Sequence, residues 1–179
     1  RMAVTAKTAR GAARKPGGAK RRHAQAVLYF QEGIQEQSMT IQLRHETPDD
    51  MAAIEAVTVA AFADAPHTSH TEQFIMRALR AAGELTLSIV AEEHGQVVGH
   101  VALSPVTITD GHGRQAEDWY GLGPISVLPQ RQGHGIGSRL MEQALSELRA
   151  MQAEGCVLLG EPAYYGRFGF QAHAGLQLP

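Results

Sequence analysis

The chain has 179 residues, a formal net charge of −2 and 44% hydrophobic residues, which is typical of one globular domain. No stretch approaches the roughly 20 consecutive apolar residues of a membrane-spanning helix. The single cysteine, Cys156, excludes an intramolecular disulfide and a cysteine-based zinc site, so a reducing, cytoplasmic location is expected.

The charges are distributed unevenly along the chain. Residues 1–38 hold eight Lys or Arg against two acids, whereas residues 39–179 hold eight Arg against sixteen acids. Because the basic opening lacks apolar periodicity, we predict that residues 1–38 are disordered and that residues 39–179 form the domain. Three interpretations of this extension stay open: an arm that binds nucleic acid or a membrane surface, a targeting peptide, and upstream or non-native sequence. The third is favoured, because a globular pattern starts directly after Met39.

The first part of the domain predicts a strand, two helices and a hairpin. Residues 40–45 alternate as a short strand, and Thr47, followed by a proline and two aspartates, is typical of a helix N-terminus. Apolar residues recur at helical spacing from Met51 to Ala61, and a second helix runs from about Thr71 until Gly83 stops it. Two β-rich runs, residues 86–92 and 96–109, then flank a turn at residues 93–95.

The second part predicts a strand at residues 115–128, interrupted at Gly123 and Pro124, and a helix from Ile136 to Met151 with apolar residues at 3.6-residue spacing. A compact apolar strand at residues 156–160, a short helix at 161–167 and a strand at 168–172 follow. The predicted class is therefore α/β (α+β), with the element order β-α-α-β-β-β-α-β-α-β.

The loop QRQGHGIGSRL, residues 130–140, has three alternate glycines between a strand and a helix N-terminus. Such a loop points backbone N–H groups and the positive end of a helix dipole at one place, which favours an anion such as a phosphate. A tight connection without a ligand is the alternative. A Walker loop is excluded because Ile136 follows Gly135 where lysine is required, and a dinucleotide fingerprint is disfavoured because Ser138 replaces its last glycine.

The residues Gln132 to Gly137 match the Q/R-x-x-G-x-G/A loop of the GNAT superfamily of N-acetyltransferases, and GEPAYYGRFGF, residues 160–170, is similar to the tail of its YhbS-like branch. The resemblance covers residues 40–179. It implies a mixed, twisted sheet flanked by helices, with acetyl-CoA bound where two strands splay apart. Members continue past the Gly-Phe strand with a further strand, so one final strand is expected to be missing here.

The resemblance also implies the residues of the acetyl-CoA site. Backbone groups near Ser126 would pair with the pantetheine arm, the loop would hold the pyrophosphate, and Arg131 or Arg139 would approach the 3′-phosphate. The residues implied for acetyl-CoA are Ile125, Ser126, Val127, Arg131, Gln132, Gly133, His134, Gly135, Ile136, Gly137 and Ser138.

Aminolysis of a thioester requires a deprotonated amine and a proton for the departing thiolate. Tyr165 occupies the tyrosine position of the family's Y-x-x-x-G-F pattern and is the predicted general acid, ahead of its neighbour Tyr164. Many relatives place a glutamate base on this strand near its bend, but residues 119–128 contain no acid here. Glu117 and Asp118 at the start of the strand, or Glu161, are the carboxylates that could act through water.

Two function classes follow: an acetyl-CoA-dependent N-acetyltransferase that acts on a primary amine by direct attack in a ternary complex, and a non-catalytic acyl-CoA-binding or interaction module. We favour the enzyme. The expected partner is a small-molecule or peptide amine, with neither a membrane nor a nucleic acid, and a homodimer is an open alternative to a monomer. No metal is expected, because His67 and His70 lack further ligands nearby.

Overall fold

The computed structural model describes residues 4–8, 41–63, 71–173 and 175–176. From β2 onward the strands and α-helices follow the predicted order. The strands are β1 (Val4–Thr8), β2 (Gln42–His45), β3 (Leu87–Glu93), β4 (Gln96–Thr109), β5 (Gln115–Val127), β6 (Gly155–Leu159) and β7 (Gln171–Ala172). The helices are η1 (Pro48–Asp50), α1 (Met51–Phe62), α2 (Glu72–Ala82), η2 (Pro129–Arg131), α3 (Ile136–Ala150), α4 (Pro162–Tyr165) and η3 (Gly166–Phe168).

The strands form one mixed sheet in the order β2-β3-β4-β5-β6-β1-β7. Strands β5 and β6 run parallel and pair only from Trp119 to Gly121, against residues 155–157. Beyond Gly121 the described part of β5 keeps its antiparallel partner β4 but has no partner on the β6 side. The end of β5 therefore offers unpaired backbone groups on the side where β6 has diverged.

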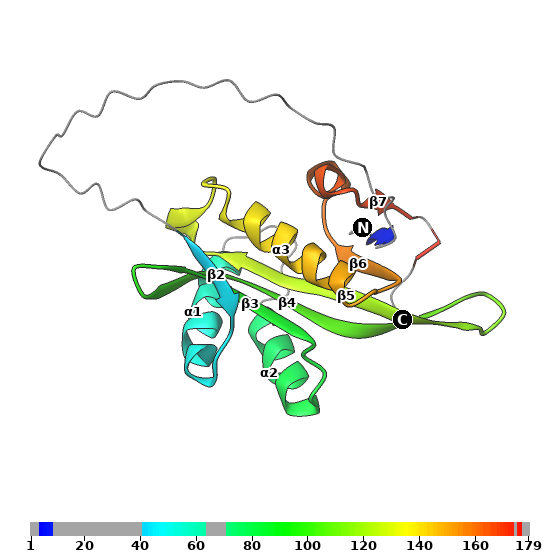
Figure 1. Ribbon diagram of the computed structural model, residues 1–179, viewed down its shortest axis with the longest axis horizontal. Helices are drawn as coiled ribbons and strands as arrows, with labels where there is room; N and C mark the ends of the chain where they lie inside the picture. Colours follow the sequence, from blue (N-terminus) through cyan, green and yellow to red (C-terminus); the bar gives the residue numbers. More distant parts are fainter. Residues whose placement is uncertain (1–3, 9–40, 64–70, 174, 177–179) are drawn as a thin grey trace, which may run out of the picture.

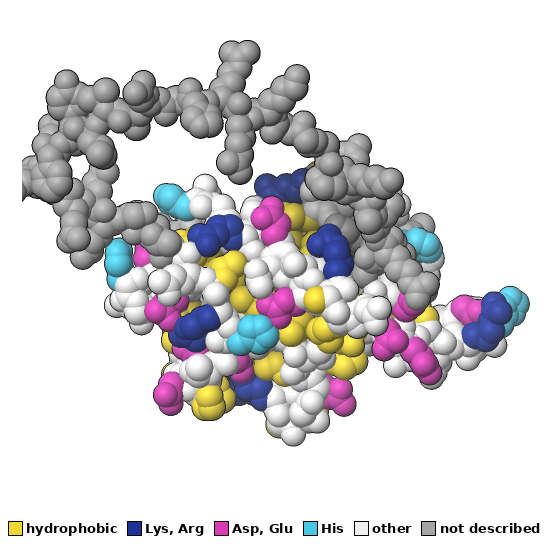
Figure 2. Space-filling view, in the orientation of Figure 1, with side chains coloured by type: hydrophobic (Ala, Val, Ile, Leu, Met, Phe, Trp, Pro, Cys, Tyr) yellow, Lys and Arg dark blue, Asp and Glu magenta, His cyan; other side chains and the backbone are white. Residues whose placement is uncertain are grey.

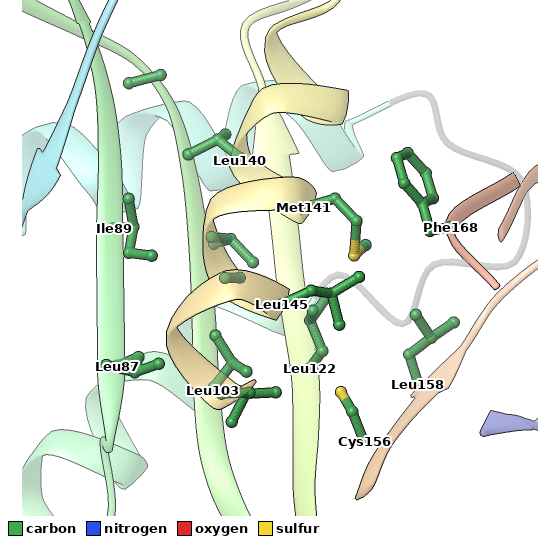
Figure 3. Packing of buried hydrophobic residues seen from close by; sticks show 14 of the residues in the cluster. Leu87, Ile89, Leu103, Leu122, Leu140, Met141, Leu145, Cys156, Leu158 and Phe168 are labelled. Atoms are coloured by element: carbon green, nitrogen blue, oxygen red, sulfur yellow. The ribbon is translucent and has the colours of Figure 1, made fainter. Parts of the chain in front are cut away.

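Helices cover both faces of the sheet (Figure 1): α1 and α2 lie on one face and α3 lies on the other. The apolar stripe predicted for α3 is buried because the helix packs along β3, β4 and β5, where Leu140 is 0% exposed (Figure 3). Burying a side chain of this size contributes about 1.5–3 kcal/mol. The main members of this core are Ile89, Val101, Leu103, Ile136, Leu140, Met141, Ala144 and Leu148.

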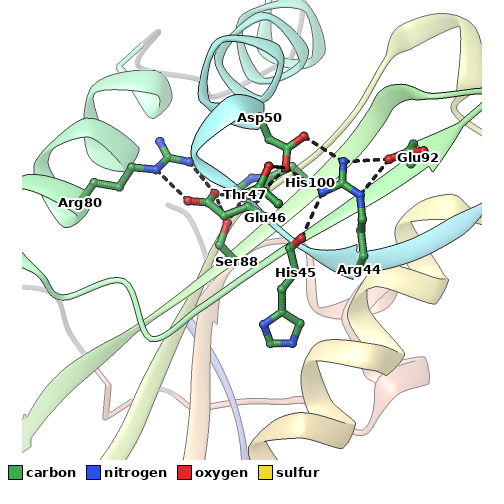
Figure 4. Close-up of polar contacts among 9 residues, drawn as sticks. All are labelled: Arg44, His45, Glu46, Thr47, Asp50, Arg80, Ser88, Glu92 and His100. Carbon is green, nitrogen blue, oxygen red and sulfur yellow. Dashed lines mark hydrogen bonds and ion pairs between the residues drawn. The ribbon is translucent and has the colours of Figure 1, made fainter.

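Polar contacts fix the start of α1 to the sheet (Figure 4). Thr47 is the N-cap of η1, as predicted, and the carboxylate of Asp50 accepts its backbone N–H at 2.6 Å. The same carboxylate accepts two hydrogen bonds from Arg44 on β2, at 2.7 and 2.9 Å. The Arg44 guanidinium holds the pKa of Asp50 well below its usual range. These hydrogen bonds tie the start of α1 to β2.

Strand β1 is a finding that differs from the prediction, because it lies within the segment expected to be disordered. Its residues Val4–Thr8 pair antiparallel with β6, and Thr5 and Ala6 also pair with β7. The stabilisation comes from backbone hydrogen bonds to strands about 150 residues away, which composition alone does not reveal. Residues 9–38 lie outside the described residues. The described sheet has seven strands rather than the six predicted. Because β1 pairs with β6, the edge of β6 that faces away from β5 has a partner.

On the face shown in Figure 2, charged side chains are interspersed with small groups of hydrophobic ones. The β4–β5 hairpin projects beyond the helices in Figure 1 and is charged at its tip, where Arg114 pairs with Asp110. Among the helices in the described part of the chain, none combines the length and the apolar composition needed to cross a membrane.

Candidate acetyl-CoA site

A cavity of about 500 Å³ lies where β5 and β6 have separated, at the N-terminus of α3. Three parts of the chain meet around it: the end of β5, the loop between β5 and α3, and the α4–η3 segment. The lining residues are Ile125, Val127, Arg131, Gln132, Gly133, Gly135, Ile136, Gly137, Ser138, Tyr164, Tyr165 and Arg167.

The glycine loop has the conformation that an anion cradle requires. Gly133 and Gly135 have φ values of 77° and 78°, in the left-handed region that is costly for other residues, and Gly135 is the N-cap of α3. A Cβ atom built at either glycine would meet no atom within 4 Å, so the space above the loop is open. The first N–H groups of α3 have no partner within the helix, and together with the helix dipole they favour a phosphate in that space.

Tyr165 lines the cavity from the α4–η3 segment. Its half-buried ring packs edge-on against Tyr164, with the ring centroids 4.9 Å apart, and against Phe170 at 6.2 Å. Burial, and then the neighbouring Tyr164, raise the pKa of the Tyr165 phenol above its ordinary value of 10.0, so the group stays protonated at neutral pH. A Cβ atom at Gly160 would lie 2.1 Å from the Tyr165 ring, so the absence of a side chain at residue 160 sets where this ring lies.

The comparisons with known proteins agree with this geometry. Residues 42–172 match the family model described as an acetyltransferase (GNAT) domain. The chain is 36% identical over 135 residues to the uncharacterized N-acetyltransferase YhbS of Escherichia coli K12, which covers 74% of both proteins. This chain belongs to the GNAT acetyltransferase family.

Two solved GNAT structures are similar to most of this chain. One is a GNAT family acetyltransferase from Brucella melitensis in complex with acetyl-CoA, with 50% identity, a TM-score of 0.69, and coverage of 79% of this chain and 92% of that one. The other is E. coli YhbS in complex with CoA, with 32% identity, a TM-score of 0.67, and coverage of 78% and 73%. The predicted family and fold class are confirmed, and so is the element order from β2 onward.

Most residues that the sequence implied for the acetyl-CoA site line the cavity of this GNAT acetyltransferase, and three side chains lie elsewhere. Ser126 is buried on the α1 side of the sheet, where its hydroxyl is 3.4 Å from that of Thr58. His134 is exposed and its Nδ1 lies 2.8 Å from the carbonyl oxygen of Gln132. Arg139 donates to the carbonyl oxygen of Ile41 at 2.8 Å, so of the two arginines expected near phosphate only Arg131 lines the cavity.

The three carboxylates considered as bases do not line this cavity. Glu117 and Asp118 line a second cavity of about 450 Å³ at the start of β5. Eight residues of extended strand separate Glu117 from Ile125, which is roughly 25 Å. Glu161 is the exposed N-cap of α4 and accepts the N–H of Ala163 at 3.4 Å. Of the three, only Glu161 belongs to the segment that carries Tyr165.

A buried polar chain lies on the α1–α2 face of the sheet (Figure 4). His100 is 0% exposed and its Nε2 lies 2.8 Å from Ser88 Oγ, which contacts Glu46, and Arg80 in turn holds Glu46 with two hydrogen bonds. Burial lowers the pKa of His100 to about 4. Burial acts to raise the pKa of Glu46, but hydrogen bonds from Arg80 and Ser88 lower it more, so it lies below its ordinary value. His100 is thus a neutral core residue at physiological pH.

Other candidate residues also have defined positions. Cys156 is buried in β6, consistent with a core role. His67 and His70 lie outside the described residues, and within the described ranges no three His, Cys, Asp or Glu side chains cluster as metal ligands would. Two lining residues, Tyr164 and Arg167, were absent from the predicted cofactor site. The YYGR sequence within the family tail contained both, but only the folded tail brings them over the glycine loop.

Proposed function

We propose that the protein is an acetyl-CoA-dependent N-acetyltransferase that moves an acetyl group to a primary amine by direct attack in a ternary complex. One observation carries the proposal: a single cavity joins an anion-binding glycine loop to a protonated, half-buried tyrosine. The two similar solved structures, which contain acetyl-CoA and CoA, support the choice of ligand. Membership of an acetyltransferase family supports the choice of reaction.

The shape and polarity of the cavity suit each part of acetyl-CoA. The pyrophosphate would accept hydrogen bonds from the backbone N–H groups of residues 132–138, where two positive-φ glycines leave the backbone accessible. The pantetheine arm would lie along Ile125 to Val127 and pair with the strand edge that β6 leaves free. This direction leads the thioester from the glycine loop toward Tyr165.

Tyr165 is suited to donate the proton that the leaving group needs. As the amine attacks the thioester carbonyl, the C–S bond breaks and negative charge develops on sulfur, whose thiol has an ordinary pKa of about 8.5. A phenol with a pKa above 10.0 keeps its proton at neutral pH and donates a hydrogen bond to this sulfur without ionising beforehand.

The attacking amine, with a free pKa near 10, must lose a proton before it reacts. Glu161 is the carboxylate proposed to take that proton through water, because it lies four residues before Tyr165 in the same segment. Residues 39–179 hold sixteen acids against eight arginines, and this excess of negative charge favours a cationic acceptor. The cytoplasmic location and the choice between monomer and homodimer remain predictions.

The proposal is tested by measuring thiol release from acetyl-CoA with a panel of primary amines, and by comparing Tyr165→Phe with Tyr164→Phe. Loss of a general acid lowers kcat by about 10²- to 10⁴-fold. We expect that loss for Tyr165→Phe, with the Kd for acetyl-CoA nearly unchanged, and near-normal kcat for Tyr164→Phe. Equal kcat for the two variants would contradict the role of Tyr165. Binding of acetyl-CoA without thiol release for any amine would favour the alternative, a non-catalytic acyl-CoA-binding module.

A further inference from the structure

Arg167 links the tail of the domain to the first turn of α3. It lies in η3, directly after the α4 turn that carries Tyr165, and its Nη2 donates to Ser138 Oγ at 3.2 Å. Its guanidinium lies over the ring of Tyr164, 3.9 Å from the centroid, and 4.8 Å from the centroid of Phe168. Two aromatic rings and a hydroxyl thus hold an exposed arginine over the glycine loop, in the wall of the cavity.

The charges around the cavity make Arg167 different from the other lining arginine. Arg131 forms an ion pair with Glu93, which is only 9% exposed, so its positive charge is largely neutralised within the protein. None of the ion pairs found among the described residues involves Arg167. Of the two arginines that line the cavity, Arg167 is therefore the one whose positive charge is available to bind an anionic ligand.

Its position selects one of the phosphate groups of coenzyme A. Ser138 is the third residue of α3, so the Arg167 guanidinium already reaches the turn where unpaired helix N–H groups would bind a diphosphate. Only one N–H of the guanidinium is used by Ser138, and its planar fork of remaining donors matches phosphate oxygens. Stacking on Tyr164 restricts the arginine before the ligand arrives, which reduces the ordering that binding requires.

We propose that Arg167 binds the diphosphate of the coenzyme A moiety, clamping it between the α4–η3 segment and the first turn of α3. This inference rests on the proposed function, because it takes acetyl-CoA as the ligand. Since Arg167 lies two residues after Tyr165, the same contact would hold the acid-bearing segment against the bound cofactor.

The test is calorimetric titration of the full chain with CoA and with dephospho-CoA, which keeps the diphosphate but lacks the 3′-phosphate. Arg167→Ala is compared with Arg167→Lys and with Arg149→Ala, an exposed arginine in the last turn of α3, far from the loop. Loss of charge-assisted hydrogen bonds should weaken binding by about 10- to 100-fold. We expect Arg167→Ala to weaken both ligands by the same factor, Arg167→Lys to recover part of the affinity, and Arg149→Ala to bind as the unaltered protein does.

Two results would overturn the inference while leaving the proposed function intact. If Arg167→Ala weakened CoA but not dephospho-CoA, the arginine would contact the 3′-phosphate instead of the diphosphate. If it weakened neither, while the unaltered chain bound both, Arg167 would have no part in binding. Failure of the folded, unaltered chain to bind either ligand would overturn the proposed function and this inference together. Melting temperatures within a few degrees of the unaltered chain establish that each variant is folded.

Discussion

The position of Tyr165 depends on a residue that has no side chain, Gly160. A methyl group at Gly160 would lie 2.1 Å from one ring carbon of Tyr165 and 2.7 Å from another. Carbon atoms approach each other to about 3.5 Å, so the ring must move by about 1.4 Å to accommodate Gly160→Ala. A misplacement of about 1 Å in a catalytic group costs on the order of 10²-fold in rate. Gly160→Ala should therefore lower kcat by about 10²-fold.

Gly166→Ala is the matched control. Gly166 lies next to Tyr165, has an ordinary helical φ of −55°, and a Cβ atom there would meet nothing within 4 Å. Steady-state thiol release and acetyl-CoA titration should show that Gly160→Ala loses kcat and keeps its Kd, whereas Gly166→Ala keeps both. In a Tyr165→Phe background, Gly160→Ala should cause no further loss, because the acid is already absent. Full activity in Gly160→Ala, or a full additional loss in the double variant, would refute the reasoning.

Three further predictions concern stability. His100 is buried and neutral with a pKa of about 4, so the unfolded state binds more protons than the folded state as the pH falls below 6.5. The free energy of unfolding should therefore fall by about 3 kcal/mol between pH 6.5 and 4. Urea unfolding of His100→Gln should lack this part of the decrease, and a pH dependence identical to that of the unaltered chain would contradict the prediction. Leu140→Ala should lower the free energy of unfolding by about 2–5 kcal/mol, because Leu140 is fully buried. Leu159→Ala, at a site 40% exposed, should lower it by less than about 1 kcal/mol. Equal losses would contradict the packing described for α3. Ala6→Pro should lower the melting temperature, because Ala6 pairs with both β6 and β7, and an unchanged melting temperature would contradict the placement of β1 in the sheet.

The elements that could be predicted from the sequence are those with local causes. Three signals act within a few residues: the apolar spacing of α3, the capping sequence at Thr47, and the left-handed Gly83 after α2. Each of these helices lies where the sequence predicts it. Strand β1 could not be predicted in this way. Its five residues are stabilised by backbone pairing with β6 and β7, and that pairing depends on how the distant strands come together.

The same distinction between local and distant causes applies to the residues of the site. The glycine loop could be predicted because its conformation depends on consecutive residues, and glycine makes the positive φ of Gly133 and Gly135 accessible without a steric cost. The positions of the candidate carboxylates could not be predicted, because Glu117 and Ile125 belong to the same strand, β5, but line different cavities. The stacking of Arg167 over the loop was missed for a related reason: it requires the tail to fold back on α3.

The central claim is that the cavity at the glycine loop binds acetyl-CoA, and calorimetric titration of the full chain with acetyl-CoA tests it most directly. The variant is Gly135→Glu, which places a carboxylate in the loop at a φ of 78°. The control is Gly113→Glu, which imposes the same strain at a φ of 80° in the exposed β4–β5 turn. The account predicts micromolar binding by the unaltered chain and by Gly113→Glu, and no binding by Gly135→Glu. A folded chain that binds no acetyl-CoA, or equal affinity in the two variants, would contradict it.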